Sequence, residues 1–144
     1  MISDFADPKD LAKNVESARV ISKELKMKVK IRPHINEDGV KNPEYLIDEK
    51  LADLKNIQGL GGIKHGLDSS KKQQCEYTVF NLSAFDTVEP EMLKNKLNGI
   101  YKLYGEKYSG QQMVFIYKRK AVKVSWQDVA DGKTIDLLKE LQEQ

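Results

Sequence analysis

The sequence predicts an α/β fold in which a mixed central sheet carries helices on both faces. Three features indicate it: helical periodicity over residues 8–26, an alternating hairpin over 43–55, and an apolar strand over 77–82 between two further helical segments. The elements run in the order helix, strand, hairpin, helix, strand, helix, two strands, helix (α-β-ββ-α-β-α-ββ-α). Such an alternation gives a sheet sandwiched by helices. At 144 residues the chain has the length of a single domain, 1–144.

The N-terminal part of the chain contains the first predicted helix and strand. Asp7-Pro8 is typical of a helix N-cap followed by proline at the first helical position. Apolar residues then recur at helical spacing, which predicts one amphipathic helix over 8–26. Met27–Ile31 alternates between apolar residues and lysines, so we expect a half-buried strand there, followed by a turn at 36–39.

A short hairpin over residues 43–55 places charged groups side by side. A two-residue turn at Asp48-Glu49 would put Glu44 opposite Asp53. Lys55 lies two residues beyond Asp53, so the alternation of a strand places it on the same face. Opposed strand residues have Cβ atoms about 5 Å apart, and like charges at that spacing destabilise a sheet unless a cation neutralises them. The pairs expected in this register are Ile47 with Lys50, Leu46 with Leu51, and Tyr45 with Ala52.

Two carboxylates and a lysine are the groups that metal-assisted phosphodiester cleavage requires. Carboxylate oxygens are ligands for Mg²⁺ or Mn²⁺, and a lysine orients a water or offsets the charge that develops on phosphorus. Glu44 and Asp53 are therefore the predicted metal ligands, and Lys55 is the third predicted catalytic residue. The alternative interpretation is a solvated hairpin whose charges keep an edge strand soluble.

The second half of the chain supplies the rest of the sheet. A glycine-containing loop over 56–62 leads into a helix over 63–74, and 77–82 is apolar enough to be a central strand. A long helix is expected from Glu89 to about Tyr108, with its tyrosines used in packing. The remaining elements are a buried strand at 113–117, a basic turn at 118–120, an edge strand at 121–126 and a last amphipathic helix after Gly132.

These residues and this order resemble a known nuclease family. Pro43-Glu44, followed after eight residues by Asp53-Leu54-Lys55, is similar to the PD-(D/E)xK motif. The similarity extends to the C-terminal tRNA nuclease (toxin) domain of contact-dependent inhibition proteins and to related phage and mobile-element domains, and it covers roughly residues 12–125. The segments that carry it are Val29–Pro33, Asn42–Ile47, Ala52–Lys55, a glutamine-bearing helix and the strand through Asn81-Leu82.

The resemblance implies a metal-dependent nuclease that hydrolyses phosphodiester bonds, with tRNA as substrate, and that acts as a toxin neutralised by a cognate immunity protein. It also implies a polar contact from Gln73 or Gln74. Glu44 stands where the family has aspartate, and Asp53 stands where it has glutamate. These exchanges either compensate within one metal site or mark an inactive copy. Asp48-Glu49 also replaces the Asn-Gly that suits a type I′ turn.

Several charged residues are candidates for nucleic-acid contact or for a wider metal site. Lys64, Lys71 and Lys72 give one helix a basic face, and Gln73 is a further candidate for nucleic-acid contact on the same helix. Lys118, Arg119 and Lys120 form the densest positive cluster, to which Lys123 would add. Both patterns also fit an ordinary solvated surface. Glu16, Glu24 and Asp48 are lesser candidates for the metal site, because the helical and turn patterns place them nearer to solvent.

Two other function classes remain open from the sequence. A metal-independent ribonuclease of the barnase or colicin type would depend on His34 or His65 rather than on the carboxylates. The non-enzyme alternative is a binding module, such as an inactive nuclease-like domain or an antitoxin-like partner.

The composition limits the partners and the kinds of site that the chain can have. The net charge of +2 permits a nucleic-acid partner without arguing strongly for one. The single cysteine, Cys75, excludes an intrachain disulfide, and one cysteine with two histidines cannot form an ordinary structural zinc site. The sequence has no pattern of a signal peptide and no membrane-spanning stretch, so we expect a cytoplasmic site of action, with any export carried by something outside these residues.

Overall fold

The structure is a computed structural model that describes residues 8–32 and 43–142. The expected turn at 36–39 and His34 lie outside these residues. The elements are α1 (Pro8–Leu25), β1 (Val29–Ile31), β2 (Tyr45–Ile47), β3 (Lys50–Asn56), α2 (Gly62–Lys72), β4 (Tyr77–Asn81), α3 (Pro90–Tyr104), β5 (Gln112–Tyr117), β6 (Lys120–Ser125), α4 (Trp126–Ala130), α5 (Thr134–Leu138) and the 3₁₀ helix η1 (Lys139–Gln142).

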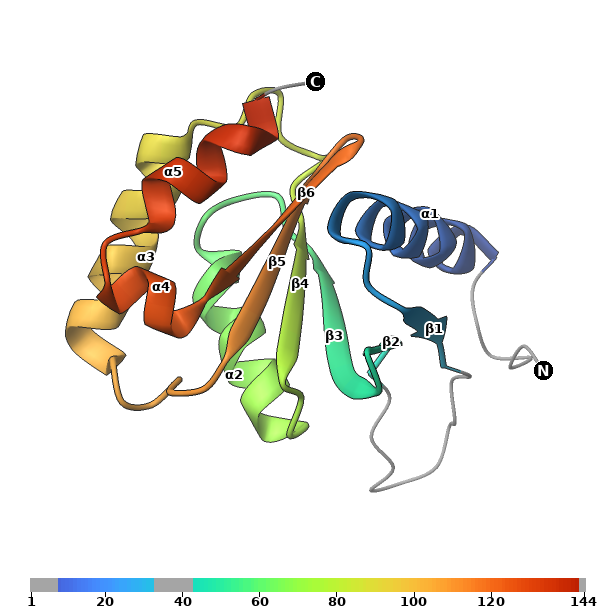
Figure 1. Cartoon of the computed structure of the whole chain (residues 1–144), viewed down its shortest axis with the longest axis horizontal. Coiled ribbons are helices and arrows are strands. Elements are labelled where there is room, and N and C mark those ends of the chain that lie inside the picture. Colours follow the sequence, from blue (N-terminus) through green and yellow to red (C-terminus); the bar gives the residue numbers. More distant parts are fainter. Residues whose placement is uncertain (1–7, 33–42, 143–144) are drawn as a thin grey trace.

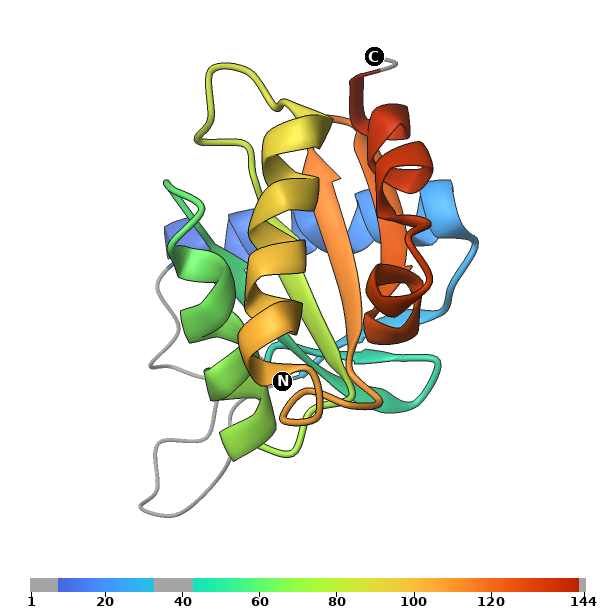
Figure 2. The ribbon, with the colours of Figure 1, turned by 90° about the vertical axis from the view of Figure 1, so that its left-hand side faces the viewer.

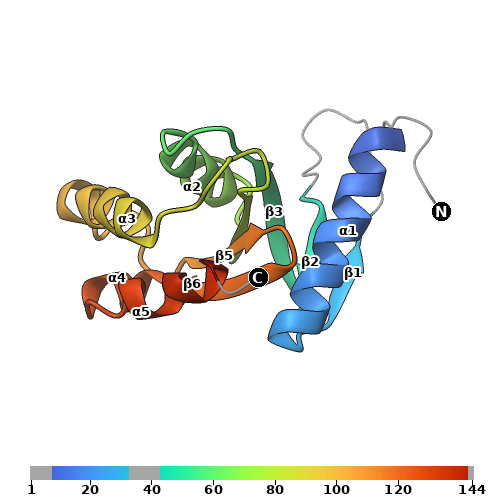
Figure 3. The same cartoon turned by 90° about the horizontal axis from the view of Figure 1, so that it is seen from above.

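The sheet has six strands in the order β1-β2-β3-β4-β5-β6. Its central pairs, β3 with β4 and β4 with β5, are parallel, and the outer pairs are antiparallel. Helix α1 lies on one face, whereas α2, α3, α4 and α5 lie on the other (Figures 1 and 3). Figure 2 shows α2, α3 and the C-terminal helices side by side over that second face. The predicted mixed sheet with helices on both faces is therefore confirmed.

Two apolar cores lie on the two faces of the sheet. The side under α1 contains Tyr45, Ala52 and Leu54 from the hairpin. The side under the other helices contains Phe80 and Phe115, whose ring centroids are 5.3 Å apart. Asp53 lies between Ala52 and Leu54 in the sequence. Because successive strand residues point to opposite faces, its side chain points to the second face, away from α1. Within the described parts of the chain, no helix is long and apolar enough to cross a membrane.

The β2–β3 hairpin has the register that the sequence predicts. Tyr45 pairs with Ala52, Leu46 with Leu51, and Ile47 with Lys50. The two turn residues adopt φ values of 47° at Asp48 and 70° at Glu49, as a type I′ turn requires. Asp48 Oδ1 accepts a hydrogen bond from the Lys28 N–H at 2.9 Å, and the Asp48 N–H donates to the Lys28 carbonyl at 2.8 Å. These bonds help to stabilise a turn conformation that aspartate and glutamate adopt at some cost.

Several predicted boundaries are wrong, including the end of α2, which comes at Lys72 rather than Gln74. The first strand begins at Val29 rather than Met27, after Lys26 with its positive φ of 54°. Helix α3 ends at Tyr104, not near Tyr108. The last helix is interrupted, with α5 passing into the 3₁₀ helix η1. Trp126 opens a helix, α4, that the sequence analysis placed in the edge strand.

Helix α4 forms because Ser125 caps it. The Ser125 hydroxyl accepts the Asp128 N–H at 3.0 Å, while the Asp128 carboxylate accepts the Ser125 N–H at 2.9 Å. This reciprocal capping box satisfies two backbone donors that a helix start otherwise leaves unpaired. It also turns Trp126 into the core, where its ring packs edge-on against Tyr108 at 5.5 Å between centroids. Tyr108 is thus a buried packing residue, although it lies beyond α3.

Candidate active site

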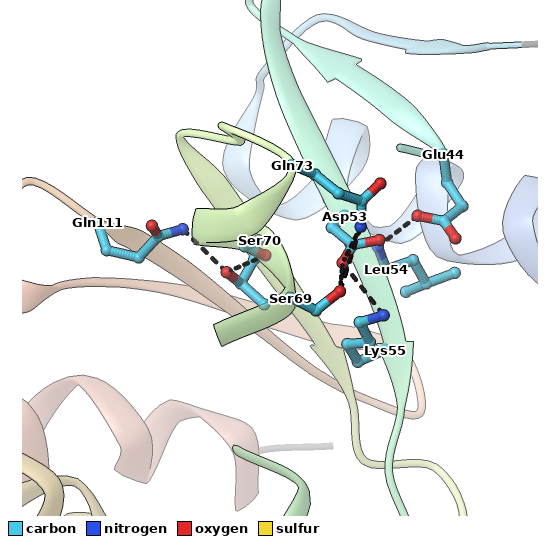
Figure 4. Close-up of polar contacts among 9 residues, drawn as sticks. Glu44, Asp53, Leu54, Lys55, Ser69, Ser70, Gln73 and Gln111 are labelled. Carbon is cyan, nitrogen blue, oxygen red and sulfur yellow. Dashed lines mark hydrogen bonds and ion pairs between the residues drawn. The ribbon is translucent and has the colours of Figure 1, made fainter. Parts of the chain in front are cut away.

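Asp53 is the most buried carboxylate of the candidate site. It lies in the middle of β3 on the α2 face and is only 2% exposed. A buried carboxylate is costly unless polar partners surround it. Three donors lie around its Oδ2 atom: Lys55 Nζ at 3.2 Å, Ser69 Oγ at 3.1 Å and Gln73 Nε2 at 3.2 Å (Figure 4). Asp53 is therefore held in one orientation by β3 itself and by α2.

Glu44 approaches the same site from the residue before β2. The register would place Pro43 opposite Leu54, but the strand pairing has ended there. The Glu44 carboxylate takes over, and its Oε2 accepts the Leu54 N–H at 2.7 Å (Figure 4). A backbone donor that the strand ladder leaves unpaired is thus satisfied by a side chain. This bond brings the Glu44 carboxyl group beside Asp53.

The proximity of the two acids changes the titration of Glu44. Burial, followed by a hydrogen bond and charge repulsion from Asp53, raises the pKa of Glu44 to about 7, although the Leu54 N–H acts in the opposite direction. Two carboxyl groups that share a site cannot both ionise without cost. Near neutral pH, Glu44 is therefore only partly ionised unless a cation lies beside it.

Helix α2 reaches the site because Gly66 lets it approach the sheet closely. A Cβ atom at Gly66 would lie 2.5 Å from a ring carbon of Phe80 and 3.2 Å from Cγ of Lys55. Ser69 and Gln73 follow one and two turns later, and their spacing of four residues places them on the same helical face. Gln73, the C-cap of α2, donates to both Ser69 and Asp53. Of the two predicted alternatives, Gln73 and Gln74, the structure brings Gln73 to Asp53.

A second polar chain lies next to the first and ties α2 to the sheet. The Thr78 hydroxyl donates to Ser70 Oγ at 2.6 Å, and Gln111 Nε2 donates to Thr78 Oγ1 at 2.9 Å (Figure 4). Thr78 is the register partner of Asp53 in the neighbouring strand. Four residues of the two polar chains were not predicted from the sequence: Ser69, Ser70, Thr78 and Gln111. A signal was present for Ser69, since it precedes Gln73 by one helical turn.

The residues present fit a Mg²⁺ or Mn²⁺ ion. Glu44 and Asp53 offer carboxylate oxygens from adjacent positions, and Mg²⁺ is commonly bound through one or two carboxylates while waters and substrate phosphates complete its shell. The described part of the chain contains no group of three or more His, Cys, Asp or Glu side chains placed to hold an ion. The donor set thus suits an ion shared with substrate rather than one enclosed by protein alone.

The lesser candidates for the metal site lie elsewhere. Glu16 is exposed on α1. Glu24 forms an ion pair with Lys120, with 3.4 Å between Oε1 and Nζ. Asp48 is exposed in the hairpin turn and accepts the Lys28 N–H instead. Within the described residues, none of these three acids is grouped with Glu44 and Asp53, as the helical and turn patterns favoured.

The lysines of α2 differ in their surroundings. Lys64 pairs with Asp68 at 2.9 Å and lies over the ring of Tyr104, so it faces α3. Lys71 donates to the Lys107 carbonyl at 2.7 Å, whereas Lys72 is exposed in the last turn. Lys64 and Lys71 thus contact groups of the protein itself, and the role of these lysines in binding nucleic acid stays a prediction.

The basic turn after β5 lies at the carboxyl ends of the parallel strands. Lys118 lies over the ring of Tyr117 at 5.2 Å, and Lys120 pairs with Glu24. Together with Arg119, Lys23 and Glu24, they line a hollow beside α1. Lys123 pairs with Val114, whose side chain belongs to the core under α1. Lys123 is therefore on the face opposite to Asp53, and its Nζ lies 5.8 Å from the centroid of the Tyr77 ring, at the start of β4. The basic turn lies at the other end of these strands, so Lys123 does not extend it.

Of the two histidines, His65 lies within the described residues. His34 lies outside the described residues. His65 is exposed on α2 and precedes Ser69 by one helical turn, on the same face of the helix. The position of His65 therefore does not decide between a histidine-dependent ribonuclease and a site formed by Glu44 and Asp53.

Comparison with known proteins adds an independent result. The family model described as "Contact-dependent growth inhibition CdiA C-terminal domain" matches residues 41–122, a segment that contains Glu44, Asp53, Lys55 and Gln73. Among solved structures, the chain is similar to the "CdiA-CT/CdiI toxin and immunity complex from Burkholderia pseudomallei", with a TM-score of 0.59 and 17% identity over 87% of this chain and 93% of that chain. At this identity the similarity shows the fold alone. No curated protein matches the chain.

Proposed function

The chain belongs to the family of contact-dependent growth inhibition CdiA C-terminal domains, and from this membership and the geometry around Asp53 we propose that it is a toxin-type, metal-dependent endonuclease. Its reaction would be the hydrolysis of phosphodiester bonds, with tRNA as the favoured substrate. The arrangement of the hairpin, α2, β4 and α3 also supports the PD-(D/E)xK resemblance.

One observation carries the proposal: Glu44 and Asp53 lie side by side with Lys55 on the same face of the hairpin. The ion pair between Lys55 Nζ and Asp53 Oδ2 is 3.2 Å long, and Lys55 is still 33% exposed. Its ammonium group therefore borders both the buried carboxylate and solvent, where a substrate phosphate would arrive. A purely structural ion pair has less need of a neighbouring acid whose ionisation is disfavoured.

Glu44 and Asp53 would hold the ion in this proposal. A bound Mg²⁺ or Mn²⁺ supplies Lewis-acid activation of a phosphoryl oxygen and stabilises charge in the transition state. Lys55 would orient the attacking water and offset negative charge on the phosphorane. Ser69 and Gln73 would keep Asp53 Oδ2 fixed, so that its other oxygen stays directed at the ion.

The exchange of the two acids is compatible with an active site. Glu44 lies outside β2 and its longer side chain reaches across to the Leu54 N–H, whereas the shorter Asp53 is set into β3. The longer acid on the outside and the shorter acid on the inside compensate each other in reach. This arrangement favours an active site over a degenerate copy.

Substrate would extend from this centre over neighbouring cations. Lys72 is exposed at the end of α2 nearest Gln73, and the other predicted nucleic-acid contacts stay proposals. They are Lys64, Lys71, Lys118, Arg119 and Lys120.

A cognate immunity protein is the proposed protein partner. The solved structure that resembles this chain is described as a toxin and immunity complex. Because tRNA is the proposed substrate, the proposed site of action is the cytoplasm of a target cell.

Incubation of the purified domain with total tRNA and, separately, with plasmid DNA in the presence of Mg²⁺ or Mn²⁺ tests the proposal. We expect cleavage of tRNA, and we expect Asp53→Ala and Lys55→Ala to abolish it together with growth inhibition on expression. His65→Ala and His34→Ala should retain most of the cleavage. Cleavage that persists in Asp53→Ala but is lost in a histidine variant would instead support a metal-independent ribonuclease.

A further inference from the structure

The edge strand β1 and the residue after it place two cations, Lys30 and Arg32, on the same face of the sheet as the candidate active site. Val29 and Ile31 pair with Ile47 and Tyr45, whose side chains belong to the core under α1. Lys30, which alternates with them, pairs with Leu46 and points to the opposite face.

Arg32 continues this pattern one step further. Its N–H donates to the Glu44 carbonyl at 2.9 Å, which extends the β1–β2 pairing beyond the strand ends and makes Arg32 the neighbour of Glu44. Directly opposed residues on a sheet have Cβ atoms about 5 Å apart. Arg32, Glu44 and Asp53 therefore follow one another across the sheet in a single row.

This side of the β1–β2 hairpin is accessible. Lys30 is exposed and Arg32 is half-buried. Leu46 and Leu51, which share the face, are only half-buried, so the packing over them is incomplete. Helix α1 crosses the other face of these strands, and α2 lies over β3 and β4 (Figure 3).

The Arg32 guanidinium is positioned rather than left free to swing. One of its Nη1 hydrogens is donated to the Pro43 carbonyl at 3.0 Å. This bond uses one of the five N–H donors of an arginine side chain and leaves its planar fork suited to a phosphate. The bond holds this cation beside Pro43, the residue that precedes Glu44.

We propose that Lys30 and Arg32 bind the phosphates of the nucleic acid that flank the scissile one, on the β1 side of the active site. The proposal rests on the proposed nuclease function and adds the path of its substrate. Alternate residues of a strand are about 6.6 Å apart, so the two cations present a row of positive charge that leads to Glu44 and Asp53. A polyanion is the ligand with complementary charge, and Lys55 meets it on the far side of the carboxylates.

The test is the salt dependence of tRNA binding, measured by fluorescence anisotropy with labelled total tRNA in an Asp53→Asn background that prevents cleavage. The variants are Lys30→Gln, Arg32→Gln and their double variant. Arg32→Lys keeps the charge and loses the fork. The matched control is Lys133→Gln with Lys139→Gln, which removes the same charge from exposed positions near the C-terminus, on and beside the C-terminal helices.

Log affinity falls as log salt rises, and each lost phosphate contact should make this slope shallower by about one. We expect each single variant to bind roughly tenfold more weakly and the double variant to lose both contacts. Arg32→Lys should recover the salt slope, and the control pair should keep it. In the cleaving protein the same variants should raise KM and leave kcat nearly unchanged, because the contact is equal in ground and transition states.

An unchanged salt slope in a folded double variant would overturn the proposal. Because Arg32 also supports Pro43, the exposed Lys30→Glu variant provides a second criterion, and binding equal to the parent would again contradict it. The result is separable from the nuclease function. Cleavage that does not depend on Lys30 and Arg32 removes only this inference, whereas binding that depends on them without any cleavage removes only the proposed reaction.

Discussion

Gln73 Nε2, at the C-terminal end of α2, lies 3.2 Å from Asp53 Oδ2 in β3, and the same amide nitrogen lies 3.2 Å from Ser69 Oγ. One side chain thus ties the end of a helix to the buried carboxylate of the candidate site. Groups that orient a metal ligand commonly affect metal affinity or activity by about 10- to 100-fold. Loss of the Gln73–Asp53 contact should therefore affect the proposed reaction through the orientation of Asp53.

Gln73→Ala should lower cleavage of tRNA by about 10- to 100-fold and raise the Mn²⁺ concentration needed for half-maximal rate. Asp53 would lose one donor and with it part of its fixed orientation. The matched control is Gln127→Ala, an exposed glutamine on α4. Equal metal dependence in the Gln73 variant and the parent would show that this contact is only structural.

Glu44 gives the protein a pH dependence. Burial and Asp53 raise the pKa of Glu44 to about 7 from 4.5. Between these values the folded state binds more protons than the unfolded state, so the free energy of unfolding falls as pH rises. We expect the melting temperature, without divalent ions, to fall between pH 5 and pH 8 by more in the parent than in Glu44→Gln, after other titrations cancel in the comparison.

Mg²⁺ or Mn²⁺ should reduce that difference at pH 8, because an ion that binds the ionised pair stabilises the folded state. If the melting temperatures of the parent and of Glu44→Gln change with pH by the same amount over this range, Glu44 is not the group responsible.

Gly66→Ala should destabilise the protein by about 1–3 kcal/mol, the usual cost of overpacking. The new methyl group would meet the Phe80 ring at 2.5 Å and Lys55 at 3.2 Å, so α2 would have to move outward. Cleavage should fall as well, since Ser69 and Gln73 move with α2. Gly99→Ala on α3 is the control: nothing lies within 4 Å of its Cβ position, so alanine should stabilise the helix there. Urea denaturation measures both, and equal stability of the two variants would refute the close approach.

Thr78→Val should cost about 1–3 kcal/mol in the free energy of unfolding, because Ser70 and Gln111 lose the hydroxyl between them. Ser70→Ala combined with Thr78→Val should cost less than the sum of the two single variants, since one unpaired hydroxyl is then removed. A double-mutant cycle by chemical denaturation measures this coupling. Strictly additive costs would mean that the Thr78–Ser70 bond contributes nothing.

The sequence was sufficient for the hairpin, and the reason is geometric. Strand alternation has a period of two, so a two-residue turn at Asp48-Glu49 determines the facing of Asp53 and Lys55 together. The approach of Glu44 followed from the same register, although Glu44 lies outside β2 and reaches Leu54 through its side chain.

The contribution of α2 could not be derived in the same way. Helical periodicity does not determine how far a helix is rotated about its axis against a sheet, and adjacent serines can therefore serve different partners. Ser69 contacts Asp53, whereas Ser70 contacts Thr78. The pairing of Lys120 with Glu24 joins two distant segments, and no local pattern predicts such a contact.

The start of α4 was a missed local signal rather than a long-range effect. Ser125 followed three residues later by Asp128 can form a capping box, and the structure shows both of its hydrogen bonds. The alternating residues before Ser125 had favoured a continued strand through Trp126.

The central claim is that the Glu44–Asp53 pair binds a divalent ion that phosphodiester cleavage requires, and its most direct test is an add-back assay with total tRNA. The purified domain is treated with EDTA, dialysed, and assayed as Mn²⁺ or Mg²⁺ is restored. We predict no cleavage after EDTA, full recovery with the ion, and no recovery at any ion concentration in Asp53→Asn. Cleavage that survives EDTA treatment would contradict the account. Full recovery of cleavage in Asp53→Asn when the ion is restored would contradict it as well.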